Sequence, residues 1–133
     1  MAEFTFHHGG VSVPSLDDAI EWYHRVLGFQ LERRFYIEAA RSHTAMVRNG
    51  HLRFEIFEVE GASPLPRDRR DPKDDLATHG NKHLAFQIAD LAEFLLEMKH
   101  KQVDIALIVQ EKFGSGCFIR DCAGNLIEFV ERI

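Results

Sequence analysis

The chain has 133 residues, a length that suits one domain with its own hydrophobic core. Hydrophobic residues make up 45% and charged residues 28%, with a formal net charge of -5, a composition typical of a globular protein. The acidic balance and the lack of a basic patch exclude nucleic acid and anionic membranes as expected partners. Because no apolar run is long enough to span a membrane and no signal-peptide pattern begins the chain, we expect a cytoplasmic protein.

The first half of the chain predicts one strand, one helix and three further strands. The alternation of residues in Phe4–Val13 favours a strand. Ser15 stands at the N-cap of an amphipathic helix, and Gly28 stands where a C-cap glycine would end it. Three predicted strands follow, with an Asn-Gly hairpin turn before the last of them: Phe29–Tyr36, Thr44–Arg48 and Leu52–Val59.

The middle segment, Gly61–Gly80, is rich in proline, aspartate and arginine. This composition predicts a linker or an active-site loop rather than a packed element. Arg67, Arg69 and Arg70 are candidates to supply positive charge to an anionic or carbonyl-bearing substrate. The alternative is a solvated run in which nearby aspartates balance these charges.

The second half repeats the pattern of the first. A strand over Lys82–Ile88 precedes a helix that is capped by Asp90 and ends near His100. The predicted strands after it are Val103–Ile108, Phe113–Arg120 and Leu126–Val130. Sliding the sequence by 75 positions places His8 on His83, with matching residue types after each histidine. We therefore predict two βαβββ modules, about 4–60 and about 81–133, joined by a linker over about 61–80.

Four polar residues recur at matched places in the two modules. His8 and Glu55 are 47 positions apart, and His83 and Glu128 are 45 apart. Each histidine is expected on the first strand of its module and each glutamate on the last. Strand alternation places all four on the face opposite the helix. His7 is expected on the helix side, so it is not a candidate ligand.

Two imidazoles and two carboxylates form a mixed nitrogen and oxygen ligand set. Such a set suits zinc, nickel, cobalt, manganese or iron(II). The metal would act as a Lewis acid toward a substrate that binds through two adjacent oxygens. Glu55 or Glu128, on loosening from the metal, would transfer a proton, which makes both candidate catalytic residues. The two cysteines, Cys117 and Cys122, match no zinc pattern and are expected to be free thiols.

Segments along nearly the whole chain resemble the vicinal oxygen chelate superfamily, which includes glyoxalase I, methylmalonyl-CoA epimerase, extradiol dioxygenases and antibiotic resistance proteins. The resemblance is carried by His7–Val13, Ala19–Phe29, Phe54–Ile56, Gly80–Phe86 and Asp121–Phe129. It implies a single α+β domain whose paired βαβββ modules form an open, cupped mixed sheet, and a homodimer. It also implies that His8, Glu55, His83 and Glu128 fall on the four metal positions of glyoxalase I, with zinc or nickel preferred and iron, manganese or cobalt as alternatives.

Departures from this pattern narrow the expected substrate. Glyoxalase I has an arginine four positions after its first ligand and an asparagine four after the first glutamate, which help to hold glutathione. Here those positions are Ser12 and Val59. We therefore expect a glyoxalase-I-like lyase or isomerase that acts on a small oxygenated molecule other than the glutathione hemithioacetal. The alternatives are an iron(II) ring-cleaving dioxygenase and a protein that sequesters a drug or metabolite.

Overall fold

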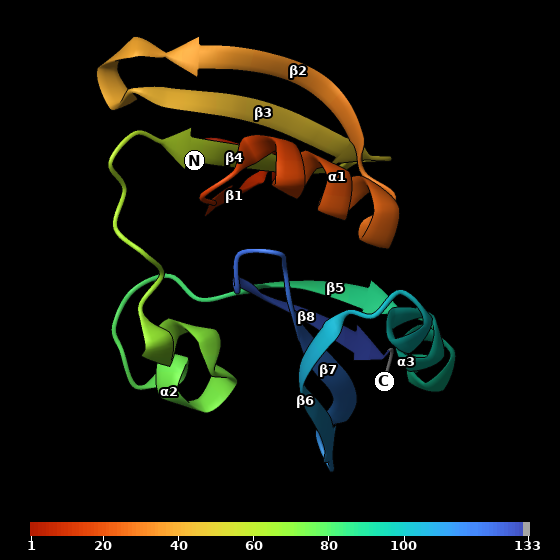
Figure 1. The fold of residues 1–133 in the computed structure, drawn as a ribbon. Helices are drawn as coiled ribbons and strands as arrows, with labels where there is room; N and C mark the ends of the chain where they lie inside the picture. Colours follow the sequence, from red (N-terminus) through yellow and green to blue (C-terminus); the bar gives the residue numbers. More distant parts are fainter. Residues whose placement is uncertain (132–133) are drawn as a thin grey trace. The chain divides into compact units, whose positions relative to one another are not determined.

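The computed structural model describes residues 1–131 and contains two compact units, Met1–Ser63 and Pro64–Ile133 (Figure 1). The first unit contains β1 (Gly9–Ser12), α1 (Leu16–Leu27), β2 (Gln30–Ile37), the 3-10 helix η1 (Glu38–Ala40), β3 (Ser42–Asn49) and β4 (Leu52–Val59). The second contains η2 (Arg67–Arg70), α2 (Pro72–Leu76), β5 (Leu84–Ile88), α3 (Leu91–His100), β6 (Asp104–Glu111), β7 (Gly114–Arg120) and β8 (Leu126–Glu131). None of the helices within the described residues is long and apolar enough to cross a membrane.

Each unit holds one four-stranded mixed sheet, and the two sheets have the same topology. Their strand orders are β1-β4-β3-β2 and β5-β8-β7-β6. In both, the first strand runs parallel to the last and the other neighbours are antiparallel. The α+β class and the paired strand–helix–three-strand modules predicted from the sequence are therefore confirmed.

Helix α1 lies along one face of the first sheet, and local signals define its ends (Figure 1). The Ser15 hydroxyl accepts a hydrogen bond from the Asp18 amide at 3.3 Å. Gly28 ends the helix with φ of 73°, a left-handed conformation that glycine adopts without a Cβ clash. On the buried side, the Tyr23 ring lies 5.0 Å from that of Phe54 on β4, which anchors the helix to the sheet.

Helix α3 meets the second sheet in the equivalent way. Asp90 accepts a hydrogen bond from the Glu93 amide at 2.9 Å, as the N-cap prediction requires. The Phe94 ring stacks 4.3 Å from Phe129 on β8.

A carboxylate on the last strand of each unit also accepts a hydrogen bond from the first turn of the helix in that unit. Glu58 accepts from the Leu16 amide at 2.8 Å, and Glu131 accepts from the Leu91 amide at 2.9 Å. A carboxylate at a helix N-terminus satisfies an amide that has no partner within the helix. The repeat detected in the sequence therefore extends to individual hydrogen bonds.

Two expectations about chain segments are corrected by the structure. The first strand is Gly9–Ser12 rather than Phe4–Val13, and Phe4 and Phe6 are exposed. Gly61–Gly80 contains the packed helices η2 and α2 rather than only a linker or loop. The segment is packed because the buried Asp75 carboxylate lies 2.5 Å from Arg69 and 3.4 Å from Lys82. These ion pairs fix the segment within the second unit.

Candidate metal centre

The first candidate pair is held at the parallel edge of the first sheet. Glu55 lies on β4 opposite Gly10 of β1, and His8 directly precedes β1. The His8 Nε2 atom is 3.3 Å from Glu55 Oε1. The side chains are 33% and 20% exposed, so the pair is partly open to solvent.

The second pair has the same construction in the second unit. Glu128 lies on β8 opposite Ala85 of β5, and His83 directly precedes β5. The His83 Nε2 atom is 3.1 Å from Glu128 Oε1. In both units the histidine stands two residues before the residue that faces the glutamate, and the same ring nitrogen contacts the carboxylate.

The structure therefore brings the four predicted residues together as two pairs, one in each unit. Among residues 1–131, no group of three or more histidine, cysteine, aspartate or glutamate side chains is arranged around one point. Each pair supplies one imidazole nitrogen and one carboxylate oxygen, so the two pairs together contain the mixed donor set that suits zinc and its neighbours in the first transition row. The donor chemistry therefore fits a divalent cation, and convergence of the four residues on one ion stays a prediction.

His7 occupies a different place from the one expected. Because the strand begins only at Gly9, alternation does not extend back to His7, which is exposed rather than buried under the helix. Its Nδ1 atom lies 2.7 Å from His8 Nδ1, and the two rings meet edge to face at 5.0 Å. When His8 donates from Nδ1, its Nε2 atom carries the lone pair that binds a cation, and a partner at the other ring nitrogen is the usual support for a ligating histidine.

The face of each sheet away from its helix carries the candidate pair, and its other side chains differ between the units. In the second unit the His83 ring packs edge to face on Phe118 of β7 at 4.7 Å. Leu107 lies beside Phe118 on the outer strand β6 and is 43% exposed. In the first unit Met46 and Arg33 occupy the corresponding register positions beside Glu55. The sequence pattern does not reveal Phe118, Leu107 and Arg33 as neighbours of the glutamates, because only the pairing register places them in one row.

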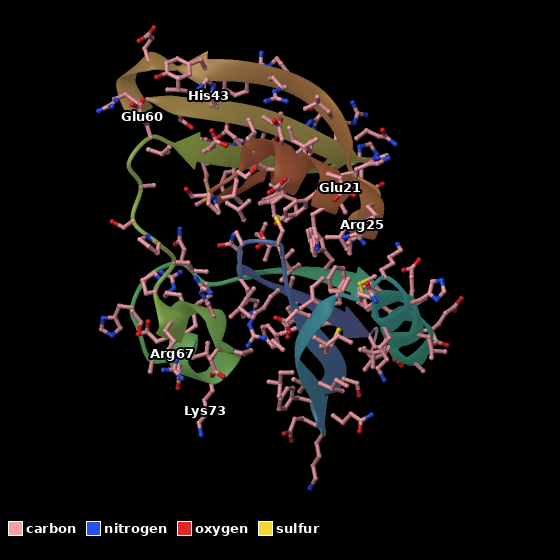
Figure 2. All side chains as sticks on the ribbon, in the orientation of Figure 1. Glu21, Arg25, His43, Glu60, Arg67 and Lys73 are labelled. Carbon is pink, nitrogen blue, oxygen red and sulfur yellow. The ribbon has the colours of Figure 1, made fainter. Side chains whose placement is uncertain are left out.

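Two of the three loop arginines hold their own segment together. Arg69 contacts Asp75 and donates to the Asn81 carbonyl at 3.1 Å, and Arg70 donates to the Leu65 carbonyl at 3.3 Å. These contacts support the structural interpretation for Arg69 and Arg70. Arg67 is exposed at the start of η2 (Figure 2), and substrate contact by this residue stays a prediction.

Burial and ion pairing perturb two acidic groups. Burial within the sheet, with a smaller contribution from the charge of Glu128, raises the pKa of the Cys117 thiol to about 11, so this thiol stays protonated at neutral pH. A hydrogen bond from Arg53 lowers the pKa of exposed Glu32, with smaller contributions from neighbouring arginine charges. Neither cysteine is part of a disulfide within the described residues, and Cys117 is buried while Cys122 is exposed.

One family model matches almost the whole chain. The model described as Glyoxalase/Bleomycin resistance protein/Dioxygenase superfamily covers residues 5–129, which include both candidate pairs. No curated protein sequence matches the chain at a significant level.

Solved structures share the fold over nearly their full lengths. A glyoxalase family protein from Enterococcus faecalis aligns with a TM-score of 0.80 and 19% identity, over 96% of this chain and 97% of that one. A glyoxalase/bleomycin resistance protein/dioxygenase domain from a Frankia species aligns with a TM-score of 0.78 and 18% identity, over 99% and 100%. A mutant of the fosfomycin resistance protein FosX from Listeria monocytogenes, complexed with manganese(II) and a dihydroxypropylphosphonic acid, aligns with a TM-score of 0.73 and 16% identity, over 99% and 95%. Likeness at these identities establishes the fold alone.

Proposed function

The chain belongs to the Glyoxalase/Bleomycin resistance protein/Dioxygenase superfamily, and from this premise we propose that it is a metal-dependent, glyoxalase-I-like lyase or isomerase. Its substrate would be a small oxygenated molecule that offers two adjacent oxygens. We also propose that it works as a homodimer in the cytoplasm.

The observation that carries the proposal is the pairing of one histidine with one glutamate at the same register position of both sheets. A single exposed His–Glu contact is commonplace on protein surfaces. Its recurrence, with the same ring nitrogen and the same offset, supports a shared role for the four side chains. In the proposal, one divalent cation is held by His8, Glu55, His83 and Glu128, supplied by the two units of one chain or by two chains of a dimer.

The two histidines and the two glutamates have different roles in the proposed reaction. The cation, when bound, supplies Lewis acidity that lowers the energy of negative charge on substrate oxygens. His8 and His83 contribute neutral nitrogen ligands through Nε2. Glu55 or Glu128 accepts a proton at Oε from the carbon next to a substrate carbonyl and returns it to the neighbouring carbon, so the reaction has no net proton change. The His7 contact orients the His8 ring for its role.

Calorimetric titration of the purified protein with zinc tests the metal assignment. We expect one zinc per chain and a loss of affinity greater than about a hundredfold in His83→Ala, since removal of an outer-shell partner already costs 10–100-fold. His51→Ala, which removes an exposed histidine in the turn between β3 and β4, is the matched control and should bind zinc normally. Full occupancy in folded His83→Ala protein would contradict the four-residue assignment.

Assays of the purified protein loaded with a chosen metal separate the proposed enzyme from the dioxygenase and from the sequestering protein. A ring-cleaving dioxygenase would consume oxygen with a catechol when loaded with iron(II). A sequestering protein would bind its ligand stoichiometrically without turnover. The proposed lyase or isomerase would turn over a hydroxy-carbonyl substrate in the absence of oxygen, and a screen of such compounds with the native metal restored distinguishes the three.

A further inference from the structure

The face of the first sheet that carries Glu55 also presents one arginine without a carboxylate partner. Within the first unit, which is described throughout, five of six arginines form ion pairs: Arg25 with Glu21, Arg34 with Asp17, Arg41 with Glu60, and both Arg48 and Arg53 with Glu32. Arg33 is exposed and has no such ion pair. Its guanidinium lies instead over the Phe35 ring, 4.7 Å from the centroid.

This stacking orients Arg33 and leaves its donors available. An aromatic ring attracts the cation through one face, and the N–H groups of a guanidinium point outward in the plane, where they match the two oxygens of a carboxylate. Glu32, the adjacent acid, forms its hydrogen bond with Arg53 at 3.1 Å, and the charge of Arg33 makes only a smaller contribution to its lowered pKa. The arrangement is a cation stacked on an aromatic ring, with no carboxylate in ion-pair contact among the described residues.

The strand register places this cation in line with the candidate metal pair. Arg33 lies opposite Met46, and Met46 lies opposite Glu55. Two steps between strands separate the Arg33 and Glu55 Cα atoms by about 10 Å, with both side chains on the face away from α1. A break in the pairing between Leu31 and Arg33 sets this orientation, because one extra residue in a strand reverses the side on which the following side chains lie.

The second unit shows that the scaffold itself does not require an arginine there. It has the same break between Ile105 and Leu107, and Leu107 lies opposite Phe118, which lies opposite Glu128. The position equivalent to Arg33 is thus an exposed leucine. One copy of the duplicated framework carries a charge where the other carries an apolar group, so the strand topology does not depend on the charge.

We propose that Arg33, stacked on Phe35, is a specificity-determining residue that binds a carboxylate of the substrate, at the end remote from the two oxygens that meet the metal. This inference rests on the proposed function and adds the substrate class: an oxygenated carboxylic acid with an apolar or aromatic spacer long enough to reach from Glu55 to Arg33. The proposal places a cation for the substrate on β2, in addition to the candidate Arg67 in the middle segment.

A rigid probe measures the contribution of Arg33. 4-Carboxybenzohydroxamic acid offers two adjacent oxygens for the metal and a carboxylate across a benzene ring, and its methyl ester has the same shape without the charge. With the zinc-loaded full chain we expect the acid to bind roughly tenfold more tightly than the ester. In Arg33→Gln this preference should fall below about twofold, and Arg33→Lys should restore part of it, because a point charge lacks the planar fork.

Arg25→Gln is the control, since it removes the same charge from α1, where Arg25 pairs with Glu21 (Figure 2). It should keep the full preference. A preference that survives in Arg33→Gln, or that falls equally in Arg25→Gln, would overturn the inference while zinc binding upholds the proposed function. Absence of zinc binding by the wild-type chain would overturn both, so the two failures are distinguishable.

Discussion

Each candidate histidine approaches its glutamate from the residue just before a strand, where the backbone is not yet held by the sheet. His8 and His83 precede β1 and β5, and the glutamates lie within β4 and β8. Each glutamate thus lies within a paired strand, and each histidine lies just outside one. Binding of a cation between Nε2 and Oε1 requires only a small adjustment of the histidine, because the two atoms are already 3.1–3.3 Å apart.

Two single residues, Ser12 and Val59, bear on whether the protein binds glutathione. In glyoxalase I the matching positions carry an arginine and an asparagine that help to hold glutathione. Ser12 offers a weaker hydrogen bond and Val59 none. A missing charge-assisted contact costs about 1.5–3 kcal/mol, so two such losses weaken binding by roughly two to four powers of ten.

We therefore expect the methylglyoxal–glutathione hemithioacetal to be a poor substrate with zinc or nickel restored. Steady-state kinetics should give a catalytic efficiency below about 10⁵ M⁻¹s⁻¹. A higher value would identify the protein as a true glyoxalase I.

The raised pKa of the Cys117 thiol can be tested through the pH dependence of stability. Burial raises its pKa from 9.0 to about 11, so the folded chain retains a proton that the unfolded chain releases between these values. Unfolded protein then binds fewer protons, and the contribution of the thiol to stability falls as pH rises from 9 to 11. In urea denaturation, the stability difference between wild type and Cys117→Ser should shrink across this range. A difference that is constant with pH would contradict the raised pKa.

At the scale of elements, the helical segment of 67–76 is fixed to the strand that begins at Leu84. Asp75 accepts ion pairs from Arg69 and from Lys82, which also donates to the carbonyls of Asp75 and Thr78. Lys82 directly precedes His83, so the buried carboxylate also fixes the entry of the chain to the second candidate pair.

Asp75→Asn should lower the free energy of unfolding by about 2–4 kcal/mol, because it leaves Arg69 and Lys82 partly buried without their counter-charge. The measurement is urea denaturation, with Asp74→Asn as the matched control, since Asp74 is an exposed neighbour on the same helix and its change should stay within about 0.5 kcal/mol. Equal effects of the two substitutions would show that the network does not stabilise the unit.

At the scale of the molecule, the edges of the two sheets bear on the oligomeric state. Each sheet ends on strands that have one neighbour among the described residues, such as β2 and β6. Exposed strand edges favour pairing with another chain, and closed two-fold dimers are the commonest solution. The outer strand β6 and the turn after it also expose Leu107, Ile108 and Phe113.

Sedimentation velocity at micromolar concentration should therefore give a species of twice the 15.3 kDa chain mass. Ile108→Lys, on the outer strand, should shift the equilibrium toward the monomer if β6 is part of the contact. A wild-type protein that sediments only as a monomer would contradict the homodimer.

The sequence alone determined the elements that depend on local chemistry. Ser15 and Asp90 begin helices and Gly28 ends one, because a side-chain oxygen or a left-handed backbone satisfies the helix end within a few residues. The duplication also followed from the sequence, since two matched sets of residue types require two matched units. The four candidate ligands were found from that duplication, and their pairing within each unit agrees with it.

Only the tertiary structure decided the features that depend on contacts between distant segments. The first strand is as short as Gly9–Ser12 because β4 pairs with it only there, which placed His7 beside His8 instead of under the helix. The helices of 67–76 depend on Asp75 meeting Lys82, a contact that composition does not reveal. Arg33 joined the row of Glu55 through a shift in strand register, and a shift of one residue changes the face of every side chain beyond it.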